Sequence, residues 1–286
     1  MDAGEAPSFG KAGVVYNVID VRQSYLQRVV AEGLRVLGYP DHADRSVHFS
    51  YEFVALSPNT AKELGLPVSD EDAERSFVEM SGRKGLGVKA DDLLDHLEEK
   101  AGQEVAKRNP ELTPEAQAET ARVIARGALR FFMLKFTRNK VIVFDLDEAM
   151  SFEGEAGPYV QYAAVRAGNI LGKLGGFDAG QAAAAAGEFE MGLLDGAERS
   201  DTWELLHLLS QAEDITATAV EALELSQVAR HAFALAQRFN NYYHKYHIIS
   251  EEDPRLRGMR ALLVRLFRRR MEQTLDILGI GIPERM

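Results

Sequence analysis

Apolar residues in the first part of the chain follow the spacing of a strand, then of a helix, then of a strand again. Residues 14–20 form a β-branched run that ends in Asp20, as buried parallel strands do. Residues 24–37 repeat apolar side chains at helical spacing and stop at Gly38, and residues 46–56 return to strand composition. This order predicts a βαβ unit, which binds ligands at the carboxyl ends of its strands.

Four polar residues follow the first predicted strand, at the edge where such a unit binds its ligand: Asp20, Arg22, Gln23 and Ser24. Asp and Ser are also common helix caps, because their side-chain oxygens accept hydrogen bonds from free backbone N–H groups. Capping therefore explains two of the four residues without a ligand, and the pattern leaves both interpretations open.

Helical patterns dominate from Thr113 onward. Thr113, Pro114 and an acidic residue follow the usual order of a helix cap, first position and first turn. The other expected elements are helices at about 89–100, 202–213, 214–247 and 254–278, a helix opened by Pro158, a short extended segment at 141–144 and a Gly/Ala-rich connection at 175–187. The predicted fold is a partial α/β domain followed by an all-α bundle, mostly helical in total.

Three residues of the helix after Pro158 share one face, because Tyr159, Tyr162 and Arg166 are spaced three and four apart. Two tyrosine rings and a guanidinium on one face form a surface that can hold unpaired bases. The alternative is structural, with half-buried core tyrosines beside a solvated arginine. Periodicity by itself favours the structural alternative.

The last predicted helix is the one strongly basic stretch of an acidic chain. It carries Arg255, Arg257, Arg260, Arg265, Arg268, Arg269 and Arg270. A solvated basic face and a face that contacts phosphates both fit this pattern.

A short loop at 80–87 carries three glycines with Arg83 and Lys84 beside them. Glycine frees backbone N–H groups, and such groups together with cations can cradle a phosphate. Most loops of this composition are ordinary turns, so the pattern alone is weak evidence.

Composition and charge limit the classes of function. The 286 residues are enough for two domains, and 46% hydrophobic and 27% charged residues are typical of globular proteins. With a net charge of −11, any nucleic acid must bind to a local basic surface. The chain has no cysteine, which excludes thiolate metal sites and fits a reducing cytoplasm, and we predict no metal site. No apolar run approaches the roughly 20 residues that span a membrane, and the N-terminus has the composition of a short loose leader.

Six segments together resemble, in the same order, the C-terminal half of arginyl-tRNA synthetases, which are class I aminoacyl-tRNA ligases. They are VIDVRQS (18–24), SYEFVALSP (50–58), MSGRKGLGVKADDLL (80–94), FDLDEAMSFEG (144–154), PYVQYAAVRAGNI (158–170) and PERM (283–286). The similarity extends from about Val14 to the last residue. One segment would be weak evidence, whereas six in order are specific.

This resemblance implies two domains and a reaction. Residues 1–110 would form the second half of a Rossmann-type catalytic domain, and residues 111–286 a helical anticodon-binding domain of the DALR type. The family uses ATP with Mg²⁺ to activate arginine as arginyl-adenylate and then transfers the arginine to tRNA-Arg. The expected partners are therefore arginine and tRNA-Arg, the expected compartment is the cytoplasm, and no membrane is involved.

The resemblance also assigns residues of the catalytic half. The residues that match the family's KMSKS loop, which stabilises the phosphates of ATP, are Met80, Ser81, Arg83 and Lys84. Gln23 matches a position near the bound arginine, and His48 lies close to where the adenosine would bind.

The helix after Pro158 matches the family's anticodon-contacting helix. By this match Tyr159, Tyr162 and Arg166 contact the anticodon, and Met286 ends the chain beside them. The stacking argument and the resemblance therefore indicate the same face.

Two departures from the family affect the expected activity. Glu79 replaces the leading lysine of the loop and Gly82 its second lysine, which leaves Arg83 and Lys84 as the cationic substitutes. No HIGH-type sequence is present, and the family uses those histidines to stabilise charge on the ATP phosphates. We expect weak tRNA binding and no arginylation by this chain alone, with a separate chain as one candidate source of the first catalytic half.

Two other classes of function stay open. A non-catalytic RNA-binding or regulatory paralogue of the synthetase would not need the lysine that Glu79 replaces. A helical scaffold for protein partners would explain the bundle, but it would not explain six motifs in order.

Overall fold

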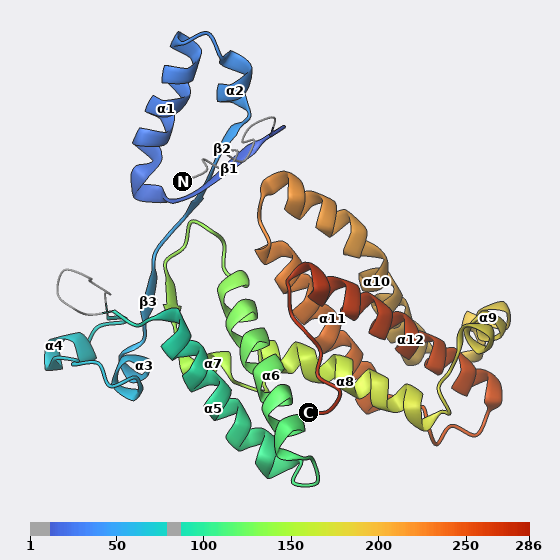
Figure 1. Cartoon of the computed structure of the whole chain (residues 1–286). Helices are drawn as coiled ribbons and strands as arrows, with labels where there is room; N and C mark the ends of the chain where they lie inside the picture. The colour runs from blue at the N-terminus through green and yellow to red at the C-terminus, as the bar shows by residue number, and fades with distance from the viewer. Residues whose placement is uncertain (1–11, 79–86) are drawn as a thin grey trace, which may run out of the picture. The chain divides into compact units, whose positions relative to one another are not determined.

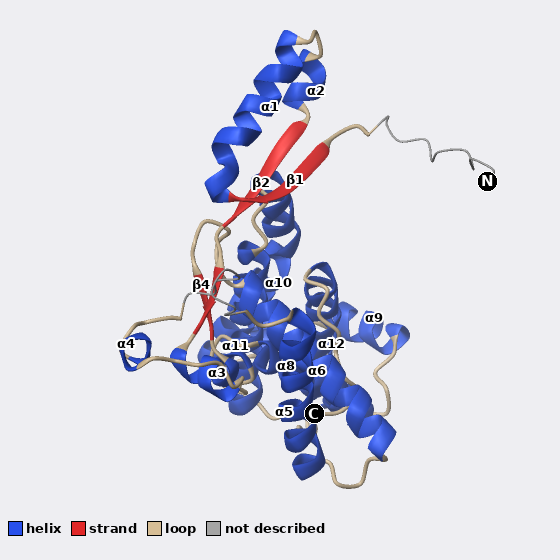
Figure 2. Ribbon diagram, turned by 60° about the vertical axis from the view of Figure 1, so that its left-hand side comes forward, coloured by secondary structure: helices blue, strands red, loops and turns tan. Residues whose placement is uncertain are grey.

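The computed structural model describes residues 12–78 and 87–286, which divide into two compact units (Figure 1). The first unit contains the described residues up to Val54 together with Arg138–Ile142, and the second contains the rest. Most of the described chain is helical, as predicted, and the strands are short (Figure 2). The predicted domain boundary at residue 110 stays a prediction, and the helices on its two sides, α5 (Ala90–Arg108) and α6 (Pro114–Leu134), pack against each other.

The first unit confirms the predicted strand–helix–strand order. In chain order it consists of β1 (Val15–Asp20), the short 3₁₀ helix η1 (Val21–Gln23), α1 (Ser24–Val36), α2 (Pro40–Asp44) and β2 (Ser46–Tyr51). β1 and β2 are parallel, with Val15 opposite Ser46 and Asp20 opposite Tyr51. The carboxyl ends of both strands therefore lie at the same edge, beside η1.

The single strand predicted over residues 46–56 is divided in two. After β2, Glu52 donates its backbone N–H to the carbonyl oxygen of Arg138 (2.8 Å), not to β1. The chain then forms β3 (Val54–Leu56), which pairs with β4 (Ile142–Phe144) in a separate two-stranded sheet. Strand composition predicted both segments but not the change of partner between them.

Large apolar side chains of the first unit are exposed. On β1, Val15, Tyr16 and Val18 are 48%, 53% and 63% exposed, and successive strand residues point to opposite faces. The exposed apolar residues of α1 are Tyr25, Leu26, Val29, Val30 and Val36. In the described ranges β1 pairs with β2 alone. A strand that is apolar on both faces and has an unpaired edge is typical of the interior of a larger parallel sheet.

Helices form most of the second unit. Besides α5 and α6, it contains α3 (Pro58–Glu63), α4 (Asp70–Ala73), α7 (Leu146–Ala149), α8 (Gly157–Lys173), α9 (Ala179–Gly187), η3 (Met191–Leu193), α10 (Gly196–Ala222), α11 (Ser226–Lys245) and α12 (Pro254–Ile277). Within residues 12–78 and 87–286, none of the helices has the length and apolar character needed to cross a membrane.

The main hydrophobic core lies between α6, α8, α10, α11 and α12. Phe131 of α6, Leu205 of α10 and Phe239 of α11 are fully buried there. The rings of Phe239 and Phe267 (on α12) stack with their centres 3.8 Å apart. Each such side chain contributes about 1.5–3 kcal/mol through burial, so the bundle is held chiefly by its apolar interior.

α8 crosses α6 at a contact that requires glycine. A Cβ atom at Gly157 would lie 2.5 Å from the carbonyl oxygen of Gly127. Gln161 occupies the adjoining space, and its Nε2 donates to the carbonyl oxygens of Val123 (3.1 Å) and Gly281 (2.8 Å). This crossing fixes α8 and ties the C-terminal segment to it.

The helix break predicted between residues 213 and 214 is wrong. α10 continues to Ala222 and ends at Leu223, whose φ of 52° is left-handed. Apolar spacing does not reveal this end, because a left-handed leucine is an uncommon helix terminator. α11 therefore begins at Ser226.

The predicted connection at 175–187 contains a helix. α9 begins after Asp178, which forms a capping box with Gln181. The alanines that follow have the highest helix propensity, and this outweighs the flexibility of the neighbouring glycines.

Candidate nucleic-acid interface

The predicted anticodon face of α8 packs against α11. The Arg166 guanidinium carbon lies 4.6 Å from the ring centre of Tyr162 and 5.3 Å from that of Tyr243 on α11. Its Nη1 also donates a hydrogen bond to Oδ1 of Asn240 (2.8 Å). Two rings and an amide thus hold the guanidinium in one position.

Tyr159 lies one helical turn before Tyr162, with its ring centre 5.5 Å from that of Phe233 on α11. All these side chains are half-buried except Asn240, which is 7% exposed. The tyrosines are therefore packed against the core and still partly exposed, which combines the two interpretations drawn from the sequence. We call this group the α8–α11 cluster: Tyr159, Tyr162, Arg166, Phe233, Asn240 and Tyr243.

Sequence reasoning missed the α11 half of the cluster. Phe233, Asn240 and Tyr243 are spaced seven and three residues apart, which places them on one side of a helix. That spacing was a usable signal, but only the packing of α11 on α8 shows that this side meets Tyr159 and Arg166.

Three of the seven arginines of the basic helix make contacts inside the protein, an arrangement that neither sequence interpretation included. Arg260 is 8% exposed, and its Nε and Nη2 donate to the Glu198 carboxylate (2.6 and 2.8 Å). Its Nη1 donates to Glu251 (2.6 Å). Hydrogen bonding to Glu198 raises the pKa of Arg260, and burial raises the pKa of Tyr242, whose hydroxyl donates to the same carboxylate. This group joins α10, α11 and α12.

Two more arginines of α12 donate to backbone carbonyls. Arg265 Nη1 binds the carbonyl oxygen of Phe177 (2.6 Å), and Arg268 Nη1 that of Ala164 (2.5 Å). These bonds attach α12 to α8 and to the segment after it. Because these two guanidiniums already bind the protein, they do not form part of a continuous phosphate-binding surface.

The C-terminal segment, which comes after α12 in the chain, lies beside α6. Pro283 is buried, and Arg285 pairs with Glu111 (3.4 Å) near the start of α6. Met286 comes next and is half-buried. The segment is also joined to α8 through the bond from Gln161 to Gly281, and the role of Met286 in anticodon contact stays a prediction.

The other predicted ligand residues lie in the βαβ unit: Asp20 and Gln23 are at the carboxyl end of β1, whereas His48 is in the middle of β2. Asp20 accepts hydrogen bonds from the side chain and then the backbone N–H of Arg22 (2.8–2.9 Å), which lower the pKa of Asp20 to about 2. Gln23 ends η1 with an exposed side chain. His48 lies within β2, with Nε2 2.9 Å from the carbonyl oxygen of Ile19. Capping thus explains Asp20, while Gln23 has no capping bond.

All but the last residue of the predicted phosphate loop lie outside the described residues. This applies to Glu79 and Gly82 and to the four predicted site residues Met80, Ser81, Arg83 and Lys84. Among residues 12–78 and 87–286, no group of three or more histidines and carboxylates is placed to hold a metal ion.

The helical part is similar to one class of RNA-binding domain. The model of the DALR anticodon binding domain matches residues 160–286, which include Tyr162, Arg166 and the α11 half of the cluster. The match begins within α8 and continues through α12 to the last residue.

Whole-chain comparisons define the family of its homologues. The arginine–tRNA ligase of Deinococcus radiodurans is 36% identical over 97% of this chain and 43% of its own length, and that of Pyrococcus abyssi is 31% identical over 97% and 40%. The solved arginyl-tRNA synthetase of Thermus thermophilus has a TM-score of 0.77 and 32% identity, covering 98% of this chain and 43% of that one. The homologues are thus arginine–tRNA ligases, and this chain spans less than half their length, the C-terminal part. The predicted resemblance is confirmed.

Proposed function

We propose that this chain binds tRNA-Arg through the α8–α11 cluster, as the anticodon-binding part of an arginine–tRNA ligase. The observation that carries the proposal is the fixed position of Arg166 between Tyr162 and Tyr243. Half-buried rings and a guanidinium plane stack unpaired bases at little entropic cost, because packing already holds them in place. Tyr159 and Met286 would extend this contact.

The first unit would contribute to arginine activation. Its βαβ order supports assignment to a Rossmann-type catalytic domain over residues 1–110, with the anticodon-binding domain at 111–286. In this proposal Gln23 lies near arginine and His48 near the adenosine of ATP. Met80, Ser81, Arg83 and Lys84 would hold the phosphates of ATP with Mg²⁺ during formation of arginyl-adenylate. The lack of cysteine supports the cytoplasm as the compartment.

Activation also requires the part of an arginine–tRNA ligase that this chain does not match. The exposed apolar faces of β1 and α1 and the unpaired edge of β1 support a larger sheet that includes them. We infer that further strands cover these surfaces, supplied by the same polypeptide or by a separate chain, and that residues 1–286 alone do not arginylate tRNA.

A non-catalytic RNA-binding paralogue is the second candidate. It is favoured by Glu79 and Gly82, which stand where the resemblance expects lysines that bind phosphate. Both candidates use the same RNA-binding face, and they differ in whether ATP–pyrophosphate exchange occurs once the remaining catalytic half is supplied.

The binding proposal is tested by fluorescence titration with tRNA-Arg. Arg166→Ala should weaken binding at least fivefold, about 1 kcal/mol, because the stacked guanidinium is lost. The matched control is Arg126→Ala, which removes an exposed arginine of α6 and should change the affinity less than twofold. If both substitutions weakened tRNA binding equally, Arg166 would contribute only its positive charge. That result would contradict a specific role for the cluster.

A further inference from the structure

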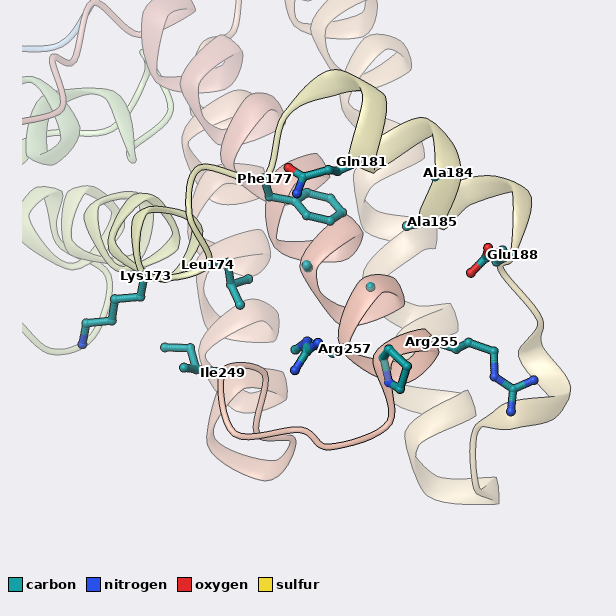
Figure 3. Close-up of a pocket in the computed structure, with 13 residues that line it drawn as sticks. Lys173, Leu174, Phe177, Gln181, Ala184, Ala185, Glu188, Ile249, Arg255 and Arg257 are labelled. Atoms are coloured by element: carbon teal, nitrogen blue, oxygen red, sulfur yellow. The ribbon is translucent and has the colours of Figure 1, made fainter.

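A concave site lies at the opposite end of α8 from Tyr159. It is a cavity of about 540 Å³ between the end of α8, α9 and the start of α12 (Figure 3). This volume is in the range of small-ligand sites. Its lining shares no residue with the α8–α11 cluster.

The walls of the cavity differ in character. Ala184 and Ala185 of α9 present only methyl groups, and the other apolar side chains of the lining are those of Leu174, Phe177, Ile249, Pro254 and Ala261. α9 is close to α12 here, since a Cβ at Gly258 would lie 3.6 Å from the Cβ of Ala185. These apolar side chains form one part of the lining, against which a base can pack.

Three cations and one carboxylate also line the cavity. Arg257 lies near the middle of the view, while Lys173 and Arg255 extend outward at opposite rims (Figure 3). Arg255 forms an ion pair with Asp253 (3.7 Å). Arg257 donates one long hydrogen bond to the carbonyl oxygen of Glu251 (3.4 Å). Glu188 is the acidic member. Unlike Arg260, Arg265 and Arg268, these cations stand at a cavity and not inside the bundle.

The cavity and the α8–α11 cluster are within reach of one RNA. Residues 159 and 173 are fourteen positions apart on α8, about 21 Å at 1.5 Å per residue. At a rise of about 3.4 Å per stacked nucleotide, about six nucleotides cover that distance.

We propose that the α8–α9–α12 cavity binds one unpaired nucleotide of the tRNA, with its base against the apolar lining residues and its phosphate at Arg257. Lys173 and Arg255 attract the neighbouring phosphates, and Glu188 accepts hydrogen bonds from base amino or ribose hydroxyl groups. This inference rests on the proposed function and adds a second contact point to it.

Hydrogen–deuterium exchange of the full chain with and without saturating tRNA-Arg tests the site directly. We expect slower exchange in α9 and in the α8–α11 cluster. Protection of the cluster without protection of α9 would overturn the cavity assignment and leave the proposed function standing, whereas protection of neither would contradict both. AMP is the second ligand, and protection of α9 by AMP but not by tRNA would assign the cavity to a free nucleotide and overturn the RNA assignment.

Two matched pairs of variants refine the test. Arg257→Ala should weaken tRNA-Arg binding about threefold to tenfold and reduce the slope of log affinity against log salt by about 1, whereas Arg269→Ala on the same helix should not show the combined effect. Ala184→Phe should fill part of the cavity and weaken binding similarly, whereas Ala183→Phe, one residue along α9, should not. Equal effects within both pairs would contradict a nucleotide in the cavity.

Discussion

At the residue scale, two arginines show how packing decides what a basic side chain does. Arg166 is half-buried and keeps an exposed edge between two rings, whereas Arg260 is enclosed by two carboxylates. Sequence analysis selected Arg166 for its place beside Tyr162, but it grouped Arg260 with the other arginines of α12. The spacing of residues along α12 cannot reveal that Glu198 of α10 supplies the carboxylate.

The buried pair of Arg260 and Glu198 should be important for stability. Glu198→Gln leaves part of the guanidinium charge uncompensated away from water, and we expect a loss of about 3–5 kcal/mol in the free energy of unfolding. Urea unfolding monitored by circular dichroism measures it. The control is Glu204→Gln on the same helix, which breaks an exposed pair with Arg238 and should cost less than about 1 kcal/mol.

His231 predicts a pH dependence of stability. Its side chain is 5% exposed, and burial and then the charge of Arg270 lower its pKa below the ordinary value of 6.5. The unfolded chain therefore takes up a proton as pH falls through 6.5 while the folded chain does not, and folding loses stability there. We expect His231→Gln to show a smaller loss of unfolding free energy between about pH 7.5 and 5.5 than the unsubstituted chain. Identical pH profiles would contradict this.

At the element scale, the position of α8 depends on its contact with α6. The sequence predicted α8 from Pro158 and helical spacing, and it also predicted β1, α1 and β2 from the change between two apolar periods. It could not predict the end of α10 or the helix within the Gly/Ala-rich connection. The end of α10 depends on a left-handed leucine, and α9 on a capping bond.

Two glycines of α8 should respond oppositely to the same change. Gly157→Ala places a methyl group 2.5 Å from a carbonyl oxygen of α6, and we expect a destabilisation of about 1–3 kcal/mol by thermal or urea unfolding. Gly172→Ala faces open space and should be neutral or stabilising by up to about 1 kcal/mol. A neutral Gly157→Ala would mean that the two helices can separate without cost.

At the scale of the whole chain, the two units differ in how completely they are packed. The helical unit encloses a continuous core, whereas the βαβ unit exposes apolar residues on β1 and α1. The order of the motifs predicted the family resemblance and the match to the C-terminal part of its members, because sequence motifs can be recognised without any knowledge of packing. It could not place the α11 half of the α8–α11 cluster, which exists only where two helices meet.

The most direct measurement is a fluorescence titration of the chain with tRNA-Arg and with the same tRNA carrying a swapped anticodon, across a range of salt. We expect tighter binding of tRNA-Arg at every salt concentration, since base contacts supply specificity that phosphate contacts lack. Equal binding of both tRNAs, with the same steep salt dependence, would show that the chain holds RNA only through its phosphates. That result would contradict anticodon recognition by the α8–α11 cluster.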